Sequence, residues 1–587
     1  MKKTMFFRSS FALTLACFGV ACGSPPPLGS EEENGSGGGS SGLEGSGGSG
    51  GPGGPAEGVD AGASSSREEV RELCAAEAPG PRLLRRLTLT ELDQVVKNIF
   101  PEIVNSADFS GVRLPADSES PLGFSTDAAT LLPTQPVVND LLKSAEAVAD
   151  AIVDPNVLGS MLPCSADAAD ATCAGEFVSK YGRRLFRRSL TEEEKSRYVG
   201  LFETVSADSD FSTGLKWTIT SLFQSPHAFY RSEVGEPNPE GGFDLTPTEI
   251  ATNLAFTYTG YPPSDELIAK AEAGELTDLG AEAEALLNQD TKLTIRSFFS
   301  EWLQYQIIRG KTRDAYEGFE LKPEGGDGSE LSTSEYMAEE TQVYTETMML
   351  GNYTMLDFFT ADWSPLNSKL ASHYGYGEDE ATSLAFVKVT RPEGQGLGVT
   401  ALGSISASTA HQTHSSPTLR GLHFYEKFLC NEPTEPPEDI PALEEATAEA
   451  PEDATTREQF ELFHATGTTC KNCHIAFEPF GFAFEEFDEA GVFRTTEKGK
   501  PIDAKTTVRF STGEVEIDGM TELANQAFQN QDMQNCASGM LAAYFLSGAG
   551  GQSCAANSLR TQVAQGQISI RQYLLGLAQT EHFRHRE

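Results

Sequence analysis

The chain has 587 residues, of which 39% are hydrophobic and 22% charged, a composition typical of a globular protein with several domains. Lys and Arg number 43 against 86 Asp and Glu, so the formal net charge is −43. A surface this acidic repels phosphate backbones, which excludes nucleic acid as a partner. Ten cysteines are too few for a disulfide-scaffold protein of this length.

The sequence of residues 1–22 is typical of the signal peptide of an exported lipoprotein. A positively charged start precedes an apolar stretch over 11–21, which is too short to span a bilayer. Gly19-Val20-Ala21-Cys22 then resembles a bacterial lipobox, in which Cys22 carries the lipid. Gly23 stands where Asp commonly retains such proteins in the inner membrane, so we expect an outer-membrane lipoprotein on the periplasmic or surface face. An ordinary secretory signal is the alternative.

Residues 23–66 predict a Gly- and Ser-rich linker, since such a segment cannot bury enough apolar surface to order itself. After this linker, no segment has about 18 consecutive apolar residues. We therefore expect the protein to contact a membrane through the lipid on Cys22.

From residue 67 onward, apolar residues recur mainly at helical spacing, which predicts a mainly α, multi-domain body. Thr191–Glu194 and Thr246–Glu249 have the sequence of helix capping boxes. Strand signals are sparse, and the best predicts a small β-hairpin over 506–517. The helical stripes include Leu141, Ala145, Val148 and Ile152; Leu215, Ile219 and Leu222; Ile295, Phe299 and Trp302; and Ile570, Tyr573 and Leu577.

Cys470-Lys471-Asn472-Cys473-His474 is a Cys-x-x-Cys-His motif. Two cysteines at this spacing can both form thioether bonds to the vinyl groups of one haem, and the histidine that follows presents its imidazole to the iron. The motif predicts one covalent haem c, attached through Cys470 and Cys473, with His474 as an iron ligand. The predicted export agrees with this, because c-type haem is attached after export.

Two other interpretations of the motif stay open. His464 lies six residues before Cys470, so a zinc ion could bind these two residues together with Cys473 and His474. A plain disulfide between the two cysteines is the simplest alternative. A thioredoxin-like redox pair lacks the βαβ context that it needs around Cys470.

The surroundings of the motif supply candidates for further haem contacts. His464 and Arg494 are candidates for contacts with the haem propionates. For the sixth iron ligand, His411 is favoured over Met520, and the other possibility is an open or water-occupied position. Five phenylalanines could wall a porphyrin or form the core of a small domain: Phe477, Phe480, Phe482, Phe484 and Phe487.

Segments rich in Pro, Gly or Glu near 235–242, 323–333 and 431–455 indicate breaks in the body. The sequence indicates no chemistry for the helical part over 83–390. We expect helical domains over 67–160, 161–235 and 243–390, a cytochrome c-like haem module over 391–495 and a C-terminal domain over 496–587.

Five successive parts of the chain carry recognisable motifs: 85–91; 182–191 and 225–231; 262–276 and 301–303; 415–421, 464, 470–474 and 479–488; and 501–503 with 518–523. In these segments the chain resembles the planctomycete- and myxobacterial-type secreted cytochrome-like proteins, which are built of five consecutive domains of unknown function. The resemblance implies a haem motif in the fourth domain and leaves the biochemical role open. His411 and His464 match positions where similar sequences often carry His.

Six cysteines remain after those of the signal, the lipid and the haem, an even number in an oxidising compartment. They allow 15 connectivities, and proximity in the sequence is the only guide. On that basis we expect the pairs Cys164–Cys173 and Cys536–Cys554, which leaves Cys74 with Cys430.

Three functional hypotheses follow. The favoured one is electron transfer at the cell envelope, in which one haem exchanges an electron with a partner of basic surface. The second is a haem oxidase or peroxidase, which needs an open distal site. The third is a non-enzymatic, glycan-associated surface scaffold whose motif binds zinc or is structural. No Ser-His-Asp signature, phosphate loop or His-Glu-x-x-His motif supports a hydrolase or nucleotide-binding protein.

Overall fold

The computed structural model of the protein describes residues 66–72, 77–104, 114, 116–118, 120–164, 170–289, 292–316, 319–320, 330–377, 379–434, 451–466, 471, 473–546, 554 and 556–587. The predicted signal peptide, the lipid site at Cys22 and the linker lie outside these residues, as do Cys74 and Cys470. Residues Gly58–Glu587 form one compact unit. The domain boundaries expected within it stay predictions.

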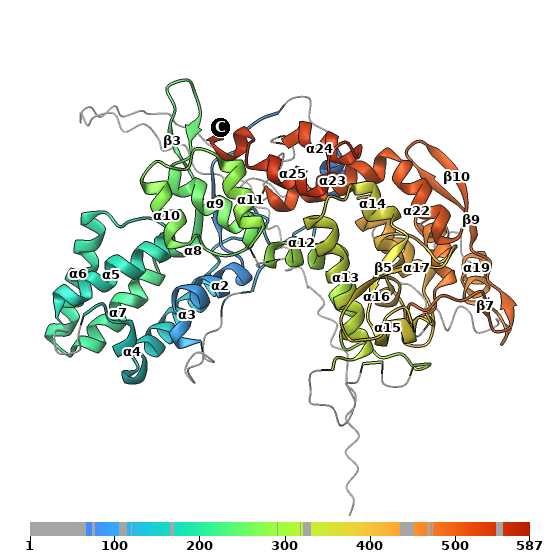
Figure 1. The fold of residues 1–587 in the computed structure, drawn as a ribbon, viewed down its shortest axis with the longest axis horizontal. Coiled ribbons are helices and arrows are strands. Elements are labelled where there is room, and N and C mark those ends of the chain that lie inside the picture. The colour runs from blue at the N-terminus through green and yellow to red at the C-terminus, as the bar shows by residue number, and fades with distance from the viewer. Residues whose placement is uncertain are drawn as a thin grey trace, which may run out of the picture. The chain divides into compact units, whose positions relative to one another are not determined.

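The described chain is mainly α, as predicted, with small antiparallel sheets of two or three strands between the helices (Figure 1). Its N-terminal third contains one short strand and a series of helices. Their bounds are α1 (Arg67–Arg71), β1 (Leu83–Arg86), α2 (Leu89–Ile99), the 3₁₀ helix η1 (Pro101–Ile103), α3 (Gln135–Val153), α4 (Pro155–Met161), α5 (Ala171–Phe186), α6 (Glu192–Ala207), α7 (Phe211–Phe223) and α8 (Pro226–Phe229).

The middle of the chain adds five short strands to a second series of helices. β2 returns to pair with β1, from Leu83 opposite Glu233 to Arg86 opposite Tyr230. The bounds are β2 (Tyr230–Glu233), β3 (Glu236–Pro237), β4 (Phe243–Asp244), α9 (Pro247–Thr259), α10 (Asp265–Glu272), α11 (Leu279–Leu287), α12 (Leu293–Leu303), η4 (Tyr305–Ile308), α13 (Thr333–Leu350), α14 (Met355–Thr360), β5 (Trp363–Leu366), α15 (Ser368–His373) and β6 (Val387–Thr390).

The last third contains the predicted hairpin and the Cys-x-x-Cys-His motif. β9 and β10 pair antiparallel over residues 505–518, which confirms the hairpin expected at 506–517. The bounds are η5 (Val399–Ala401), α16 (Gly403–Ser408), α17 (Pro417–Lys427), α19 (Thr456–Thr466), α21 (Glu478–Phe482), η6 (Ala483–Glu486), β7 (Thr496–Glu497), β8 (Lys500–Pro501), β9 (Lys505–Phe510), β10 (Gly513–Asp518), α22 (Gly519–Gln529), α23 (Gln531–Phe545), α24 (Asn557–Ala564), α25 (Ile570–Leu577), η8 (Glu581–Phe583) and β11 (His585–Arg586).

Local sequence signals placed these helices correctly. Both predicted capping boxes form, at the start of α6 and of α9, with each Thr hydroxyl accepting from the backbone N–H of the Glu three residues on. The predicted stripes on α3, α7, α12 and α25 are buried. No helix in the described part of the chain is long and apolar enough to cross a membrane.

Buried apolar side chains form two main clusters. One gathers helices from α2 to α8 around residues such as Phe177, Leu215 and Ile219. The larger one extends from α9 to the C-terminus and also takes in Val70 and Phe124 from the N-terminal part. The N-terminal residues therefore contribute to both cores.

The C-terminal end of the chain returns to its first half. β11 pairs with β4, and the Arg586 guanidinium forms a buried ion pair with Glu233. The Tyr258 hydroxyl donates to the carbonyl of Leu574 at 2.6 Å. These contacts link segments more than 300 residues apart, so the C-terminal residues are part of the folded body.

The disulfides correct part of the expected pairing. Cys164–Cys173 is confirmed, whereas Cys430 bonds to Cys536 across 106 residues of sequence, with their Cα atoms 5.4 Å apart. The predicted pairs Cys536–Cys554 and Cys74–Cys430 are therefore wrong, although Cys554 does take part in a disulfide. Tertiary packing of the end of α17 against α23 brought two cysteines together that proximity in sequence could not join.

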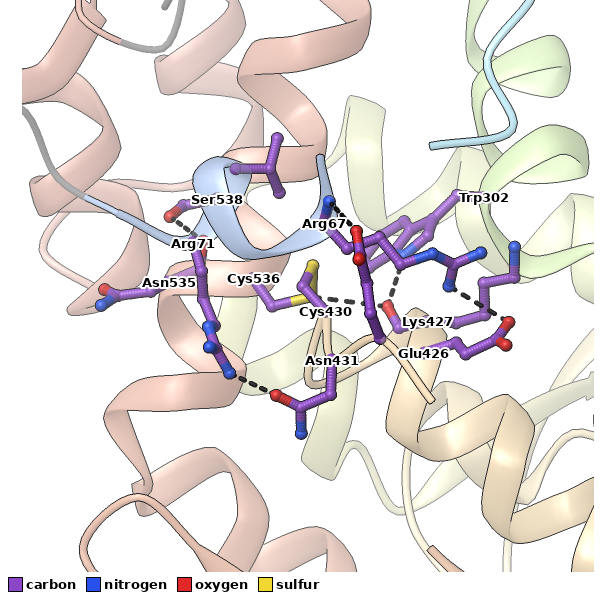
Figure 2. The surroundings of a disulfide bond; sticks show 12 residues. Arg67, Arg71, Trp302, Glu426, Lys427, Cys430, Asn431, Asn535, Cys536 and Ser538 are labelled. Atoms are coloured by element: carbon purple, nitrogen blue, oxygen red, sulfur yellow. Dashed lines mark hydrogen bonds and ion pairs between the residues drawn. A yellow bond between two sulfur atoms is a disulfide. The ribbon is translucent and has the colours of Figure 1, made fainter. Parts of the chain in front are cut away.

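The N-terminal helix α1 lies beside this disulfide (Figure 2). Arg67 pairs with Glu426 at 3.1 Å, and the Arg71 side chain donates to Asn431. Gly539 permits the approach from the other side, because an added Cβ there would lie 2.1 Å from the carbonyl oxygen of Val70. Near this disulfide, α1 thus contacts both the end of α17 and α23.

Replacing Cys430 and Cys536 together by Ala should lower the free energy of unfolding by about 2–4 kcal/mol, because the bond closes a long loop in the unfolded chain. Chemical denaturation measures this loss. The matched control replaces Cys164 and Cys173, which are nine residues apart. Because this bond closes a shorter loop, it removes less entropy from the unfolded chain, and its loss should lower the free energy of unfolding by about 2 kcal/mol less. Equal losses in the two variants would contradict this prediction.

Candidate functional site

Two helices cross closely next to the Cys-x-x-Cys-His motif. An added Cβ at Gly421 on α17 would lie 2.2 Å from the carbonyl oxygen of Phe477, and one at Gly481 on α21 would lie 1.8 Å from that of Pro417. Real Cβ atoms do not approach this closely, so both positions require glycine. The crossing fixes the segment that follows His474 against the N-terminal turn of α17.

His474 is held by a buried carboxylate. Its Nδ1 lies 2.7 Å from Oε1 of Glu478, and the Thr418 hydroxyl of α17 donates to that same oxygen. Glu478 is 2% exposed, whereas about a quarter of the His474 side chain is exposed. The imidazole therefore lies at the surface, while the group that orients it lies in the interior.

Cys473 carries a free, partly buried thiol next to this histidine. The structure does not support the plain disulfide, because Cys473 is not disulfide-bonded. Exposed apolar side chains lie close by in the sequence and on the crossing helix. Ile475 is 62% exposed, and Leu419 and Leu462 are also exposed.

Arg494 and Arg420 meet the buried carboxylate of Glu485. Arg494 donates to Glu485 and to the Ser415 hydroxyl, each at 3.1 Å, and Arg420 donates to the carbonyls of Phe484 and Phe487. Burial lowers the pKa of Arg420 to about 10, so its guanidinium stays charged at neutral pH. Burial raises the pKa of Glu485, and the two guanidinium groups oppose that shift. This network joins α17 to the chain after the motif.

Arg494 thus has partners within the protein, and its proposed contact with a haem propionate stays a prediction. The same holds for the other candidates. His411 is exposed and stacks on His414, with ring centroids 4.7 Å apart. Met520 is fully buried in the larger core at the start of α22. His464 belongs to α19, but its side chain lies outside the described residues, as does Cys470.

The phenylalanines after the motif are mostly core residues. Phe480, Phe484 and Phe487 belong to the larger hydrophobic cluster. Phe477 lies against the His474 ring, with centroids 5.2 Å apart. Of the two interpretations that the sequence left open, the structure therefore supports a domain core for most of these residues and a place beside the motif for Phe477.

Two residues that help to hold His474 were missed in the sequence, Glu478 by direct contact and Thr418 through Glu478. Glu478 follows His474 by four positions, a spacing at which side chains can meet across one helical turn, so its contact was in principle predictable. Thr418 lies 56 residues before His474, and only the crossing of α17 and α21 brings it to Glu478. No group of three or more potential metal ligands occurs among the described side chains. Two members of the expected zinc set, His464 and Cys470, are not among these side chains.

A cleft lies in the helical part of the chain, over 83–390, for which the sequence indicated no chemistry. It has a volume of about 530 Å³ and is lined by residues of 182–191 and 225–231, among them Phe186, Arg188 and His227. Arg188 is paired with Glu194 at 2.8 Å, and the buried Arg187 donates to several backbone carbonyls. Arg187 and Arg188 therefore make contacts within the protein that stabilise the walls of this cleft.

Comparison with protein families divides the chain in the same order as the motifs. Three family models match consecutive segments, each described as a protein of unknown function: PSD5 (DUF1595) over 173–233, PSD4 (DUF1592) over 245–376 and PSCyt3 (DUF1588) over 397–497. The chain contains three consecutive domains of unknown function.

Domains of these three families are associated with cytochrome-like proteins. The second, third and fourth parts of the resemblance are thus confirmed, while the first and fifth stay predictions. The DUF1588 domain contains both α17 and the motif. No curated protein and no solved structure matches the chain.

The close helix crossing gives a direct test. Gly421→Ala should lower the free energy of unfolding by roughly 1–3 kcal/mol, because the new Cβ collides with the backbone of Phe477. Gly200→Ala on α6 is the matched control, since nothing lies within 4 Å of its added Cβ. In a helix this second change should be neutral or stabilise by up to ~1 kcal/mol. Urea denaturation of both variants measures the difference, and similar values would contradict the crossing.

Proposed function

We propose that the protein is a c-type haem-binding electron-transfer protein of the cell envelope. The observation that carries this proposal is the pairing of a free Cys473 thiol with a neighbouring imidazole that is held through Nδ1. The DUF1588 domain around the motif supports it, because such domains are associated with cytochrome-like proteins.

The side chains present fit a haem c. Covalent attachment needs reduced cysteine thiols, and Cys473 supplies one beside Cys470 in the sequence. Iron ligation through His474 needs the lone pair on Nε2, which an Nδ1–H directed at the Glu478 carboxylate provides. The bound haem would supply one-electron redox chemistry. Partial exposure of His474 favours exchange with a partner at the surface.

The same proposal places the protein outside the cytoplasm. The lipobox-like sequence at Cys22 supports a lipid anchor, and the net charge of −43 supports a redox partner with a basic surface. Cys164–Cys173 and Cys430–Cys536 agree with an oxidising compartment, because disulfides persist there. Gly23 supports an outer-membrane position.

Expression together with haem-maturation machinery should yield one covalent haem per chain, measured as a pyridine haemochrome. Replacing Cys473 by Ser should alter the haemochrome band, because one thioether bond is lost, and His474→Ala should abolish stable haem binding. Wild-type protein that carries zinc, or no covalent haem, would contradict the proposal.

Carbon monoxide separates the electron-transfer protein from a haem enzyme. A six-coordinate electron-transfer haem should not bind carbon monoxide after reduction, and His411→Ala should then open the sixth position if His411 is the ligand. If Met520 is the sixth ligand instead, Met520→Ala should open that position to carbon monoxide. Ready binding by the wild-type protein would favour the oxidase or peroxidase instead.

The anchor is tested by metabolic labelling with palmitate in a bacterial host. We expect label in the wild-type protein and none in Cys22→Ser, which should be released from the membrane fraction. Cys17 is the other cysteine of the predicted signal peptide and lies in its apolar stretch. Cys17→Ser is therefore the matched control and should keep both the label and the membrane association. Loss of label in the Cys17 variant instead would place the lipid there.

A further inference from the structure

The carboxylate of Glu478 is buried and accepts from both His474 and Thr418. It is 2% exposed, and its Oε1 atom lies 2.7 Å from Nδ1 of His474. The Thr418 hydroxyl donates to that oxygen from the opposite helix. A buried carboxylate is costly unless polar partners compensate for its lost hydration, and the histidine of the motif is one of these partners.

The helix crossing determines where this carboxylate lies. Gly421 and Gly481 let α17 and α21 approach until backbone atoms are in contact, so neither helix can shift without collision. Thr418 lies one turn before Gly421, and Glu478 three residues before Gly481. Thr418 and Glu478 are therefore placed by rigid elements, and Glu478 holds His474 through Nδ1. Precise orientation of a metal ligand requires such support.

We propose that Glu478 is a positioning residue that sets the redox properties of His474 as an iron ligand, and that Thr418 moderates its effect. This inference rests on the proposed haem function. By accepting the Nδ1–H, Glu478 fixes the ring orientation and makes Nε2 a more basic ligand. An electron-rich ligand favours ferric over ferrous iron, so Glu478 keeps the reduction potential low. Thr418 draws part of the carboxylate charge away from His474, because it donates to the same oxygen.

This arrangement predicts shifts of opposite sign in two variants of similar shape. Glu478→Gln removes the negative charge and should raise the reduction potential, with about a tenfold change in the ferric–ferrous equilibrium, which is 59 mV for one electron. Thr418→Val removes the competing donor and should lower the potential. Potentiometric titration of the haem-loaded full chain, followed by its absorption spectrum, measures both. Glu461→Gln on α19 is the control for net charge, since Glu461 pairs with Arg457 at the surface, and it should leave the potential unchanged.

A purely structural role makes a different prediction. If the Glu478 carboxylate only satisfies buried donors, both variants should lower the stability and leave the potential unchanged or shift it in one direction. Either of those results overturns the proposal. The frequency of the iron–histidine stretch in the reduced protein gives an independent signature. It should fall in Glu478→Gln and rise in Thr418→Val.

A measurement without haem separates this inference from the proposed function. In the full chain expressed without haem-attachment machinery, nitrogen NMR at pH 8 should show His474 protonated on Nδ1, and Glu478→Gln should weaken this preference. His474→Asn identifies the signal. A wild-type chain that takes up no haem but shows the Nδ1–H form would overturn the proposed function and the redox role that rests on it, and would keep only the orientation of His474 by Glu478. An Nε2–H form in the wild type would overturn the role of Glu478, whether or not haem is attached.

Discussion

The close contact between α17 and α21 is the constraint on which the candidate site depends. Without side chains at Gly421 and Gly481, the backbones meet, and polar groups from segments far apart in the sequence come within hydrogen-bond distance. Thr418 reaches Glu478 on one side of the crossing, and Arg420 reaches the chain after the motif on the other. The carboxylate that orients His474 therefore depends on a packing contact of two glycines as well as on its local spacing from the motif.

Buried arginines have a comparable role elsewhere in the molecule. Arg85 forms a two-bond ion pair with Glu91, and Arg187 joins α5 to the chain around α8 through backbone carbonyls. Arg231 pairs with Glu233, which also receives Arg586 from the C-terminus. Removing one partner from such a pair leaves a buried charge without compensation and is strongly destabilising. Several segments that carry the family resemblance contain these arginines, so part of the resemblance reflects how the fold is held together.

This distinction bears on the function. Glu485 and Ser415 lie in recognisable segments, but they bond to each other and to Arg494, as a structural network does. Cys473 and His474 lie outside this network: Cys473 carries a free thiol, and His474 presents a partly exposed imidazole that Glu478 orients.

The sequence by itself determined the features that depend on neighbouring residues. Helical stripes, capping boxes, the 506–517 hairpin and the Cys164–Cys173 bond each arise within a short stretch of chain, and all were predicted. The Cys-x-x-Cys-His motif was also visible, because its chemistry depends on spacing alone. Only the tertiary structure decided that Cys430 bonds to Cys536 and that Thr418 shares the carboxylate of Glu478. These contacts depend on which helices pack together, and long-range packing leaves no periodic signal in one sequence.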